Sequence, residues 1–378
     1  MKGIPGFNGE RLRQAREALG LTQVSLADML CVTKQAISNY ECGADNPSPA
    51  VFDQMRIVLR QEAQFFMRSA FVGGSSTKFY RSMASATKRA RLRAEARHCW
   101  IRELMSHISE FIEFPVVSFP EAISCDPQKI TMEEIETIAA SLRDQWRLGT
   151  SPIPNLVEVA EANGAIVIRH NLDSAYLDGL SEWLIPESRP LIILNSDKNV
   201  SVRSRMDLAH EIGHMVLHRK VSTEQLEDQE NFDLIEEQAF RFGSALLLPE
   251  SGFLEDLYSV SLDALRSIKL KWKVSISMMI ERLKHLGIVD LEQHRRLRIN
   301  YSTRRWNREE PYESEIAIEQ PTLFIKSIQL LVSRRIQSVE QIAAQTGFSV
   351  AWVEQLLSIQ SPSAPDVSLK VVEFKRRA

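Results

Sequence analysis

The sequence predicts a mainly α-helical protein that carries a small antiparallel β-sheet, and therefore a chain of the α+β class. Three observations lead to this prediction. Apolar residues recur at helical spacing over residues 8–62 and over most of the chain beyond residue 200. Three short segments near the middle of the chain, with turn residues between them, are predicted to be strands. The length of 378 residues is sufficient for two or three domains, each with its own core.

The composition is that of an ordinary globular protein. With 44% apolar and 25% charged residues, it excludes collagen-like and wholly disordered chains. The formal charge is −3, so nucleic-acid binding would require a local basic surface. The N-terminus lacks a hydrophobic signal core and no apolar run approaches the ~20 residues of a membrane span, so we expect a cytoplasmic protein without a membrane partner. The four cysteines show no CxxC spacing, which argues against a disulfide framework or a zinc ribbon: Cys31, Cys42, Cys99 and Cys125.

Residues 1–64 are expected to form an all-helical domain. Apolar stripes at helical spacing alternate with short polar turns, and Thr22 and Thr33 precede two of the stripes as N-caps. A Gly- and Pro-rich breaker at 43–49 separates the last helix. Residues 65–125 follow as a basic helical linker with a Gly-Gly-Ser-Ser hinge at 73–76. Its arginines either contact DNA phosphates or form a solvated helix face.

A second domain is expected over residues 126–290. It begins with a helix over 131–149, where Thr131 and Glu134 have the spacing of a capping box and Gly149 is a stop. A helix over 154–163 precedes three strands, and further helices follow the strands. The strands are predicted at 165–170, 180–185 and 190–195, and the helices at 202–219, at 233–248 and, as one or two helices, within 261–286.

Residues 291–378 are expected to be a helical C-terminal region. The segment is Arg-rich to about residue 310, and helical spacing returns at 321–336 and 338–358. The last segment has the spacing of a helix-turn-helix, with Gly347 at the turn. It is a second DNA reader, a helical pair that completes the preceding domain, or a dimer contact.

One helical stretch contains the sequence HExxH, at His210, Glu211 and His214. Two histidines at i and i+4 lie on one helix face within reach of a single zinc ion, and the glutamate is placed to act as general base. A third ligand is expected from the acidic helix about 20 residues on, where Glu236 and Glu237 compete. His218 lies too far along the helix to join the same ion, so it supports a ligand or packs. The alternative is a solvated helix face with incidental histidines.

The stretches RSRMDLAHEIGHMVLH (203–218) and IEEQAFRFGSALLLP (235–249) resemble the ImmA/IrrE family of metallopeptidases. The resemblance implies a zincin-like domain in which zinc is bound by His210, His214 and Glu236, and in which Glu211 is the catalytic base. This chain departs from the family pattern in having Phe240 where Asn or Asp is usual, and Gly243 where Ala is usual. Neither departure removes a ligand.

Residues 10–59 resemble the helix-turn-helix of the XRE/Cro/cI group. The resemblance implies a recognition helix over 33–41 that reads a double-stranded operator, and a homodimer that binds two half-sites. Cys31 stands where Gly is usual at the turn, which costs backbone freedom. A protein-interaction module is the alternative for this bundle. The residues expected to contact DNA are Gln23, Thr33, Lys34, Gln35, Ser38 and Asn39.

Together the two resemblances predict a DNA-binding zinc endopeptidase that regulates transcription, with a repressor protein as its substrate. An extended substrate is expected to lie along a strand edge of the 165–195 sheet. The alternative is a transcriptional regulator, or an antitoxin-like protein, whose zinc domain senses a ligand or partner without proteolysis. The presence of Glu211 favours catalysis, because a sensing site has no need of a base beside its ligands.

Overall fold

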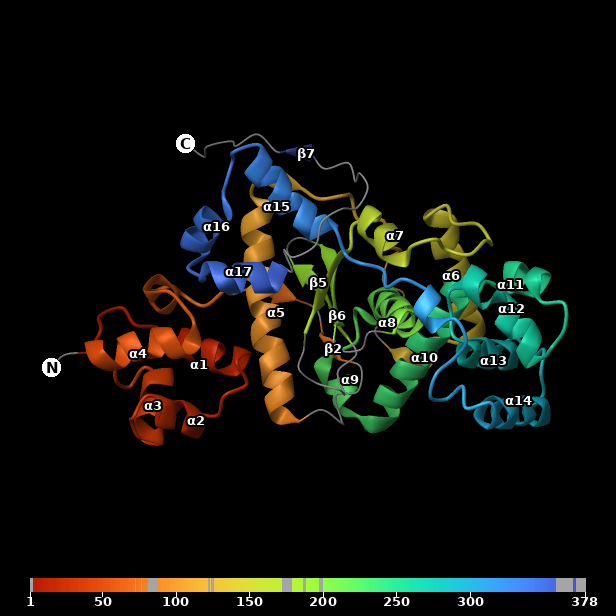
Figure 1. Cartoon of the computed structure of the whole chain (residues 1–378), viewed down its shortest axis with the longest axis horizontal. Coiled ribbons are helices and arrows are strands. Elements are labelled where there is room, and N and C mark those ends of the chain that lie inside the picture. Colours follow the sequence, from red (N-terminus) through yellow and green to blue (C-terminus); the bar gives the residue numbers. More distant parts are fainter. Residues whose placement is uncertain are drawn as a thin grey trace.

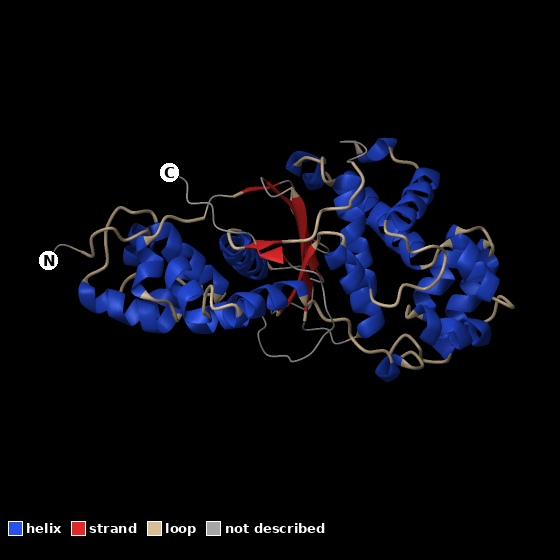
Figure 2. Cartoon of the chain, turned by 90° about the horizontal axis from the view of Figure 1, so that it is seen from above, coloured by secondary structure: helices blue, strands red, loops and turns tan. Residues whose placement is uncertain are grey.

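The computed structural model describes residues 3–71, 73–75, 77–80, 87–121, 123, 126–171, 179–185, 188–196, 200–357 and 370–371. Helices form two groups, one on each side of a small β-sheet (Figures 1 and 2). The class predicted from the sequence, mainly α-helical with a small sheet, is confirmed.

The N-terminal bundle contains four short helices: α1 Gly9–Ala18, α2 Gln23–Met29, α3 Lys34–Glu41 and α4 Pro49–Leu59. Each helix follows a residue whose side chain accepts a hydrogen bond from a backbone N–H of the first turn, which are Asn8, Thr22, Thr33 and Ser48. The predicted N-caps at Thr22 and Thr33 are therefore confirmed. A 3₁₀ turn, η1 Ala63–Met67, follows the bundle and buries two phenylalanines in its core.

The longest helix, α5 Lys88–Ser109, runs between the bundle and the sheet (Figure 1). It lies within the predicted basic linker, but Trp100, Ile101 and Leu104 are fully buried. Arg97 and Arg102 are also buried, and both donate hydrogen bonds to backbone carbonyls of neighbouring elements. The helix therefore belongs to a core, in which its apolar residues are buried together with these two arginines.

The last helices return to the side of the N-terminal bundle (Figure 1). They are α15 Leu323–Ser333, α16 Val339–Thr346 and α17 Val350–Leu357. Gly347 joins α16 to α17 with φ +83°, as the predicted turn requires. Trp352 of α17 is buried, and its ring meets that of Trp100 at 4.9 Å between centroids. This helical pair thus packs on α5, and not on the 126–290 segment, which was one of the three alternatives for it.

The central strands are β4 Ile166–His170, β5 Gly179–Ile185 and β6 Arg189–Asn195. β5 and β6 form an antiparallel hairpin, while β4 lies on the other side of β6 and runs parallel to it. The expectation of a purely antiparallel sheet is therefore wrong for β4. The connection between β5 and β6 is short, so these two strands form an antiparallel hairpin. The chain between β4 and β6 contains all of β5 and its flanking segments, and it is long enough for the crossover that a parallel pair requires.

Two very short strands, β1 Gly74–Ser75 and β2 Phe79–Tyr80, pair antiparallel with the outer edge of β5. A separate two-stranded ladder joins β3 Ile112–Glu113 to β7 Lys370–Val371. The side chains of β4 alternate between the two sides of the sheet: Ile166 and Ile168 face the bundle and α5, whereas Val167 faces the second group of helices.

The second group of helices covers the opposite face of the sheet (Figure 2). Its capping box at Thr131 and Glu134 is confirmed, although that helix ends at Gln145, before Gly149, because Arg147 already adopts φ +55°. Its elements are η2 Pro127–Lys129, α6 Met132–Gln145, α7 Leu156–Ala162, α8 Ser201–Gly213, the π-helical turn η3 His214–His218, α9 Thr223–Glu227, α10 Gln229–Leu247, α11 Glu250–Asp256, α12 Leu262–Trp272, α13 Ile276–His285, α14 Leu291–Thr303 and the 3₁₀ turn η4 Glu313–Glu315. Among the helices that the structure describes, none combines the length and apolarity that crossing a membrane requires.

Candidate metal centre and nucleic-acid interface

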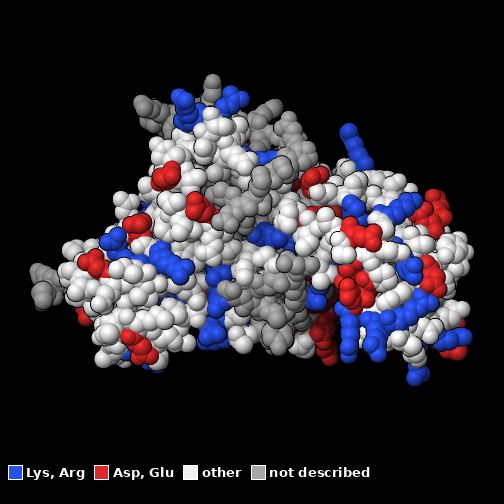
Figure 3. Space-filling model, viewed as in Figure 1, with Lys and Arg blue, Asp and Glu red and all other residues white. Residues whose placement is uncertain are grey.

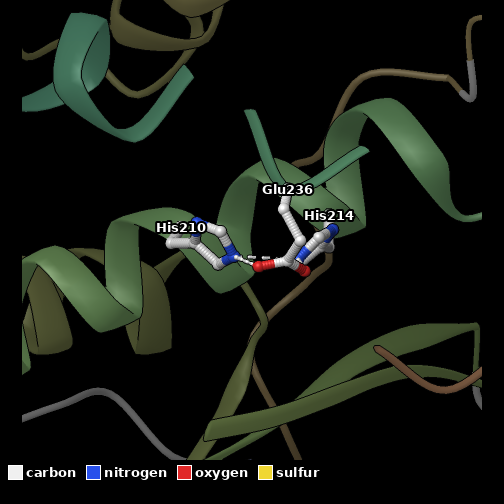
Figure 4. A group of neighbouring side chains, drawn as sticks. All are labelled: His210, His214 and Glu236. Atoms are coloured by element: carbon white, nitrogen blue, oxygen red, sulfur yellow. Dashed lines mark hydrogen bonds and ion pairs between the residues drawn. The ribbon is translucent and has the colours of Figure 1, made fainter. Parts of the chain in front are cut away.

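Three potential ligands converge where α8 crosses α10 (Figure 4). The Nε2 atoms of His210 and His214 lie 3.0 Å apart, and they lie 3.2 and 3.3 Å from the two carboxylate oxygens of Glu236. One ligand atom from each residue fits within 4.8 Å of the others. Glu237, the other acidic candidate, is exposed and points away from this group. The arrangement thus brings together the three residues that we expected to bind zinc.

Two glycines permit the close approach of α8 and α10. A Cβ atom at Gly243 would lie 2.8 Å from Met206 Cε and 3.1 Å from His210 N, and a Cβ atom at Gly213 would lie 3.1 Å from the carbonyl oxygen of Ala239. Contacts this short are avoided only where the residue has no side chain. Gly243, which departs from the family pattern, therefore sits at the helix crossing that positions the histidines.

His218 connects His214 to a fixed amide. Its Nδ1 lies 3.2 Å from His214 Nδ1, and its Nε2 lies 2.9 Å from Gln238 Oε1. Gln238 Nε2 donates to the backbone carbonyls of Pro127 and Ile130 at 2.8 and 3.0 Å, which fixes the amide with its oxygen toward His218. Burial, reinforced by neighbouring His214, lowers the pKa of His218 to about 3, so this ring is neutral.

This chain of hydrogen bonds assigns the tautomers. Because Gln238 presents an acceptor, His218 carries its proton on Nε2 and accepts at Nδ1. His214 must then carry its proton on Nδ1, which leaves the Nε2 lone pair directed at Glu236. His218 therefore supports a ligand, one of the two roles expected for it. Gln238 was missed by sequence reasoning, although it lies on the buried face of α10 two residues after Glu236.

Glu211 is fully buried beside the ligands, against β5. Its Oε2 accepts a hydrogen bond of 2.5 Å from Ser181 Oγ, and a Cβ atom at Gly179 would lie 2.8 Å from its Oε1. Ser181 therefore orients the carboxylate, and Gly179 makes room for it. Neither residue could be identified from the sequence, because nothing in a β-strand of mixed composition indicates which helix residue it will face.

The donor set fits a zinc ion. Burial alone would raise the pKa of Glu236, but the neighbouring imidazoles of His210 and His214 outweigh burial and hold that pKa well below its usual value. The site thus offers a carboxylate and two imidazole nitrogens, one of which has its lone pair fixed by Gln238 and His218. Two nitrogen ligands and one carboxylate are a common protein-ligand set of catalytic zinc.

Five of the predicted recognition residues lie on α3 or at its N-cap. Lys34 and Gln35 are exposed, while Ser38 and Asn39 are partly exposed, and Gln35 Nε2 donates to Asn39 Oδ1 at 2.8 Å. Thr33 is exposed, but its hydroxyl caps the helix by accepting from Ala36 N. The structure thus brings these five residues onto one short helix and its N-cap.

Gln23, the sixth predicted DNA contact, lies on α2. Its Nε2 donates to Glu41 Oε2 at 2.7 Å, and Glu41 is also paired with Arg16 at 2.5 Å. Gln23 is therefore held by the bundle as well as partly exposed. Cys31, at the turn where Gly is usual, adopts φ +52°, so the departure places a side chain in the left-handed region.

A basic groove of about 450 Å³ lies beside this helix-turn-helix, where α1 and α2 approach the start of α5. Lys34, Lys88 and Arg89 line it, and Figure 3 shows Lys and Arg side chains gathered along the lower part of α5 next to the bundle. The arginines farther along α5 at 97 and 102 are buried. Of the basic stretch, the first turn of α5 therefore offers charge to a partner.

Comparison with known families agrees with both parts of this geometry. Residues 12–62 match the helix-turn-helix family, and residues 160–284 match a peptidase family described as the IrrE N-terminal-like domain. Comparison with curated proteins gives no match. The matched peptidase family is generally zinc-dependent, and it includes non-catalytic members. The chain thus joins an XRE-type helix-turn-helix to an IrrE-like metallopeptidase domain.

Proposed function

We propose that this DNA-binding regulator with a metallopeptidase-like domain is a zinc-dependent endopeptidase that controls transcription by cleaving a repressor protein. The observation that supports catalysis is the position of Glu211. Its carboxylate is buried next to His210, and Ser181 holds it in one orientation. A site that only binds a metal needs neither this carboxylate nor the hydroxyl that orients it.

The residues divide the work of the reaction. His210, His214 and Glu236 would hold the zinc ion, which supplies Lewis-acid polarisation of the scissile carbonyl when it is bound. Glu211 takes the proton of the attacking water and passes it to the leaving amine. Ser181 keeps the carboxylate of Glu211 aimed by donating a hydrogen bond to its Oε2. Gln238 and His218 keep the Nε2 of His214 unprotonated.

The helix-turn-helix places this activity at DNA. Lys34 and Gln35 at the exposed start of α3 are suited to the major groove, and Lys88 and Arg89 can reach adjacent phosphates. Readers of this kind usually bind two half-sites, so we propose that the protein acts as a homodimer on a double-stranded operator.

A second candidate is a transcriptional regulator whose zinc domain senses a ligand or a partner without proteolysis. The closed state of the site favours it, because His214 and Glu211 are fully buried and only Glu236, with 22% of its side chain exposed, reaches solvent. The sensor needs the zinc ligands but not Glu211.

The experiment that tests the proposal compares the wild type with Glu211→Gln and His214→Ala. Elemental analysis measures bound zinc, and mass spectrometry follows cleavage of the repressor encoded nearest to the gene. The peptidase requires about one zinc in the wild type and in Glu211→Gln, with cleavage by the wild type alone. Zinc in both proteins without any cleavage would support the sensor, and a wild type without zinc would reject the metal centre.

A further inference from the structure

We infer that residues 74–75 and 77–80 of this chain occupy the substrate edge of its own peptidase site and hold that site closed. We call the described residues of this stretch, 74–75 and 77–80, the covering segment. The inference rests on the proposed function and adds its regulation. It follows from the strand that the segment pairs with, from the ring that it places on a metal ligand, and from its weak anchoring.

The covering segment pairs with the sheet edge that an extended peptide would need. β5 is paired with β6 along one side, and its other side faces β1 and β2. Gly74 and Ser75 lie opposite Ile185 and Leu184, and Phe79 and Tyr80 lie opposite Ser181 and Leu180. Extended substrates bind by adding a strand to an exposed edge. Here the chain itself supplies that strand, so a substrate must displace it.

Phe79 brings the covering segment onto the catalytic residues. Its ring stacks on the imidazole of His214 at 4.7 Å and an interplanar angle of 10°, and it is 2% exposed. Its partner in the strand register is Ser181, the residue that orients Glu211. The side chain of Phe79 thus lies against His214, a predicted zinc ligand. The backbone of Phe79 lies opposite Ser181, which orients the predicted base Glu211.

The apolar cluster that contains Phe79 is small. Phe79 belongs to a separate cluster with Met215, Val221 and Ile235, distinct from the two large cores of the molecule. Such a satellite cluster can open without unfolding either core. A residue that served only to stabilise the domain would be expected to join one of the large cores.

The strands of the covering segment are very short. Each of its strands spans two residues, whereas the neighbouring β5 and β6 span seven. Arg102 Nη2 donates to the carbonyl oxygen of Gly74 at 2.9 Å, and Thr77 Oγ1 donates to that of Val221 at 2.5 Å. Short ladders of this kind open at far lower free energy than the sheet beside them.

The Arg102 anchor also ties the segment to the DNA-binding side. Arg102 lies on α5, and Arg97 on the same helix donates to the carbonyl oxygen of Ala18 at the end of α1. A movement of the bundle that carries α5 with it would therefore reach the covering segment through one rigid helix. This connection gives a bound operator or partner a route by which to release the site.

A reversible disulfide tests the closure directly. A Cβ atom at Gly74 would lie 3.4 Å from Ile185 Cβ, close to the ~3.8 Å of natural disulfides. The double variant Gly74→Cys/Ile185→Cys, in a background with the exposed Cys31 and Cys42 changed to Ser, would lock the segment when oxidised and free it when reduced. A second variant, Phe79→Ala, removes the ring from His214.

The readouts are the rate at which the chelator phenanthroline removes zinc from the full-length protein and the cleavage of a random peptide mixture. We expect zinc removal to be about tenfold slower in the oxidised lock than after reduction, and about tenfold faster in Phe79→Ala than in the wild type, because removal requires local opening. Cleavage should follow the same order. Phe119→Ala is the matched control, since Phe119 packs on the same cluster but meets Trp146 and Trp183 instead of His214.

The outcomes separate this inference from the proposed function. Equal zinc-removal rates in the lock, the wild type and Phe79→Ala would overturn the closure while leaving the metal centre intact. Zinc removal that follows the lock, without cleavage by any form, would uphold the closure and reject the peptidase. A wild type that binds no zinc would reject the metal centre and the closure with it. If Phe79→Ala does not fold, the comparison of oxidised and reduced lock still decides.

Discussion

The two faces of the central sheet carry different kinds of core. The core between the sheet, α5 and the N-terminal bundle, which we call the first core, is rich in aromatic residues and contains none of the predicted metal ligands. The core between the sheet and α6–α14, which we call the second core, is mainly aliphatic and adjoins the buried histidines. The helix-turn-helix match lies in the first, and the IrrE-like match contributes most of the second. The sheet thus lies between the side that carries the helix-turn-helix, which we call the DNA-binding side, and the side that carries the proposed metal centre, which we call the metal-binding side.

The two cores also differ in how the chain builds them. The second core uses a nearly continuous stretch, from Ile130 to Tyr301, whereas the first joins residues from 12–114 and 323–356 to residues of the sheet between 166 and 193. The C-terminal helices reach the first core by way of a junction with α7. Glu161 of α7 accepts from the backbone N–H of Thr322, and Glu319 accepts from that of Leu156. Each carboxylate thus caps a helix of the other segment.

The largest expected effect is in the first core. Trp100→Ala should lower the free energy of unfolding by about 4 kcal/mol, because Trp100 is fully buried among Phe65, Phe348 and Trp352. Urea unfolding measures the loss. Hydrogen exchange should show faster opening of α1, α5 and α17 with little change in α10. An equal loss of protection in α10 would show that the sheet does not separate the two cores.

A buried ion pair provides the matching test of the second core. Glu136 of α6 accepts from Arg282 at 2.6 Å and from Arg241 at 2.6 Å, and Arg282 is buried. Burial alone would raise the pKa of Glu136, but the hydrogen bonds and charges of these two arginines hold it below its ordinary value of 4.5. Glu136→Gln should therefore cost about 3 kcal/mol at neutral pH, because it leaves a buried guanidinium without a counter-charge.

The pH dependence of that loss has a definite sign. A carboxyl whose folded-state pKa is depressed contributes stability above its unfolded pKa and loses it as the pH falls through the folded value. The difference in unfolding free energy between wild type and Glu136→Gln should thus be constant above about pH 5 and shrink below about pH 4. A difference that stays constant down to pH 3 would assign the loss to packing instead of charge.

The sequence predicted correctly those features that depend only on residues close together in the chain. The HExxH spacing, the capping box at Thr131 and the caps at Thr22 and Thr33 depend on residues within one turn of a helix, and the structure contains each of them. The parallel pairing of β4 with β6, the burial of α5 and the roles of Ser181 and Gln238 depend on partners that lie far away in the sequence. Arg97 and Arg102 are an example. An arginine-rich helix is predicted to be exposed to solvent, and only the structure shows that backbone carbonyls accept hydrogen bonds from these two buried side chains.

A smaller effect is expected at the support of the metal ligand. Gln238→Leu keeps the size of the side chain but removes the acceptor that fixes His218 and, through it, His214. Zinc affinity should fall by about 10- to 100-fold, the range for losing a partner of a ligating histidine. Competition with a fluorescent chelator measures it, and Gln229→Leu, on the first turn of the same helix, is the control. Unchanged affinity would mean that His214 selects its tautomer without Gln238, while DNA binding should be unaffected in either case.

The smallest expected effect lies on the DNA-binding side. Lys34 is exposed at the start of α3 and lines the groove that also contains Lys88 and Arg89. A lysine that contacts a phosphate releases about one counterion, so Lys34→Ala should lower the salt dependence of binding to a short mixed-sequence duplex by about one unit in log–log slope. Fluorescence anisotropy over a range of salt concentrations measures the slope. Lys284→Ala removes an equal charge from α13 in the second core and should leave the slope unchanged. If both variants lower the slope equally, DNA contacts both sides of the sheet, and the division of the molecule into a DNA-binding side and a metal-binding side would fail.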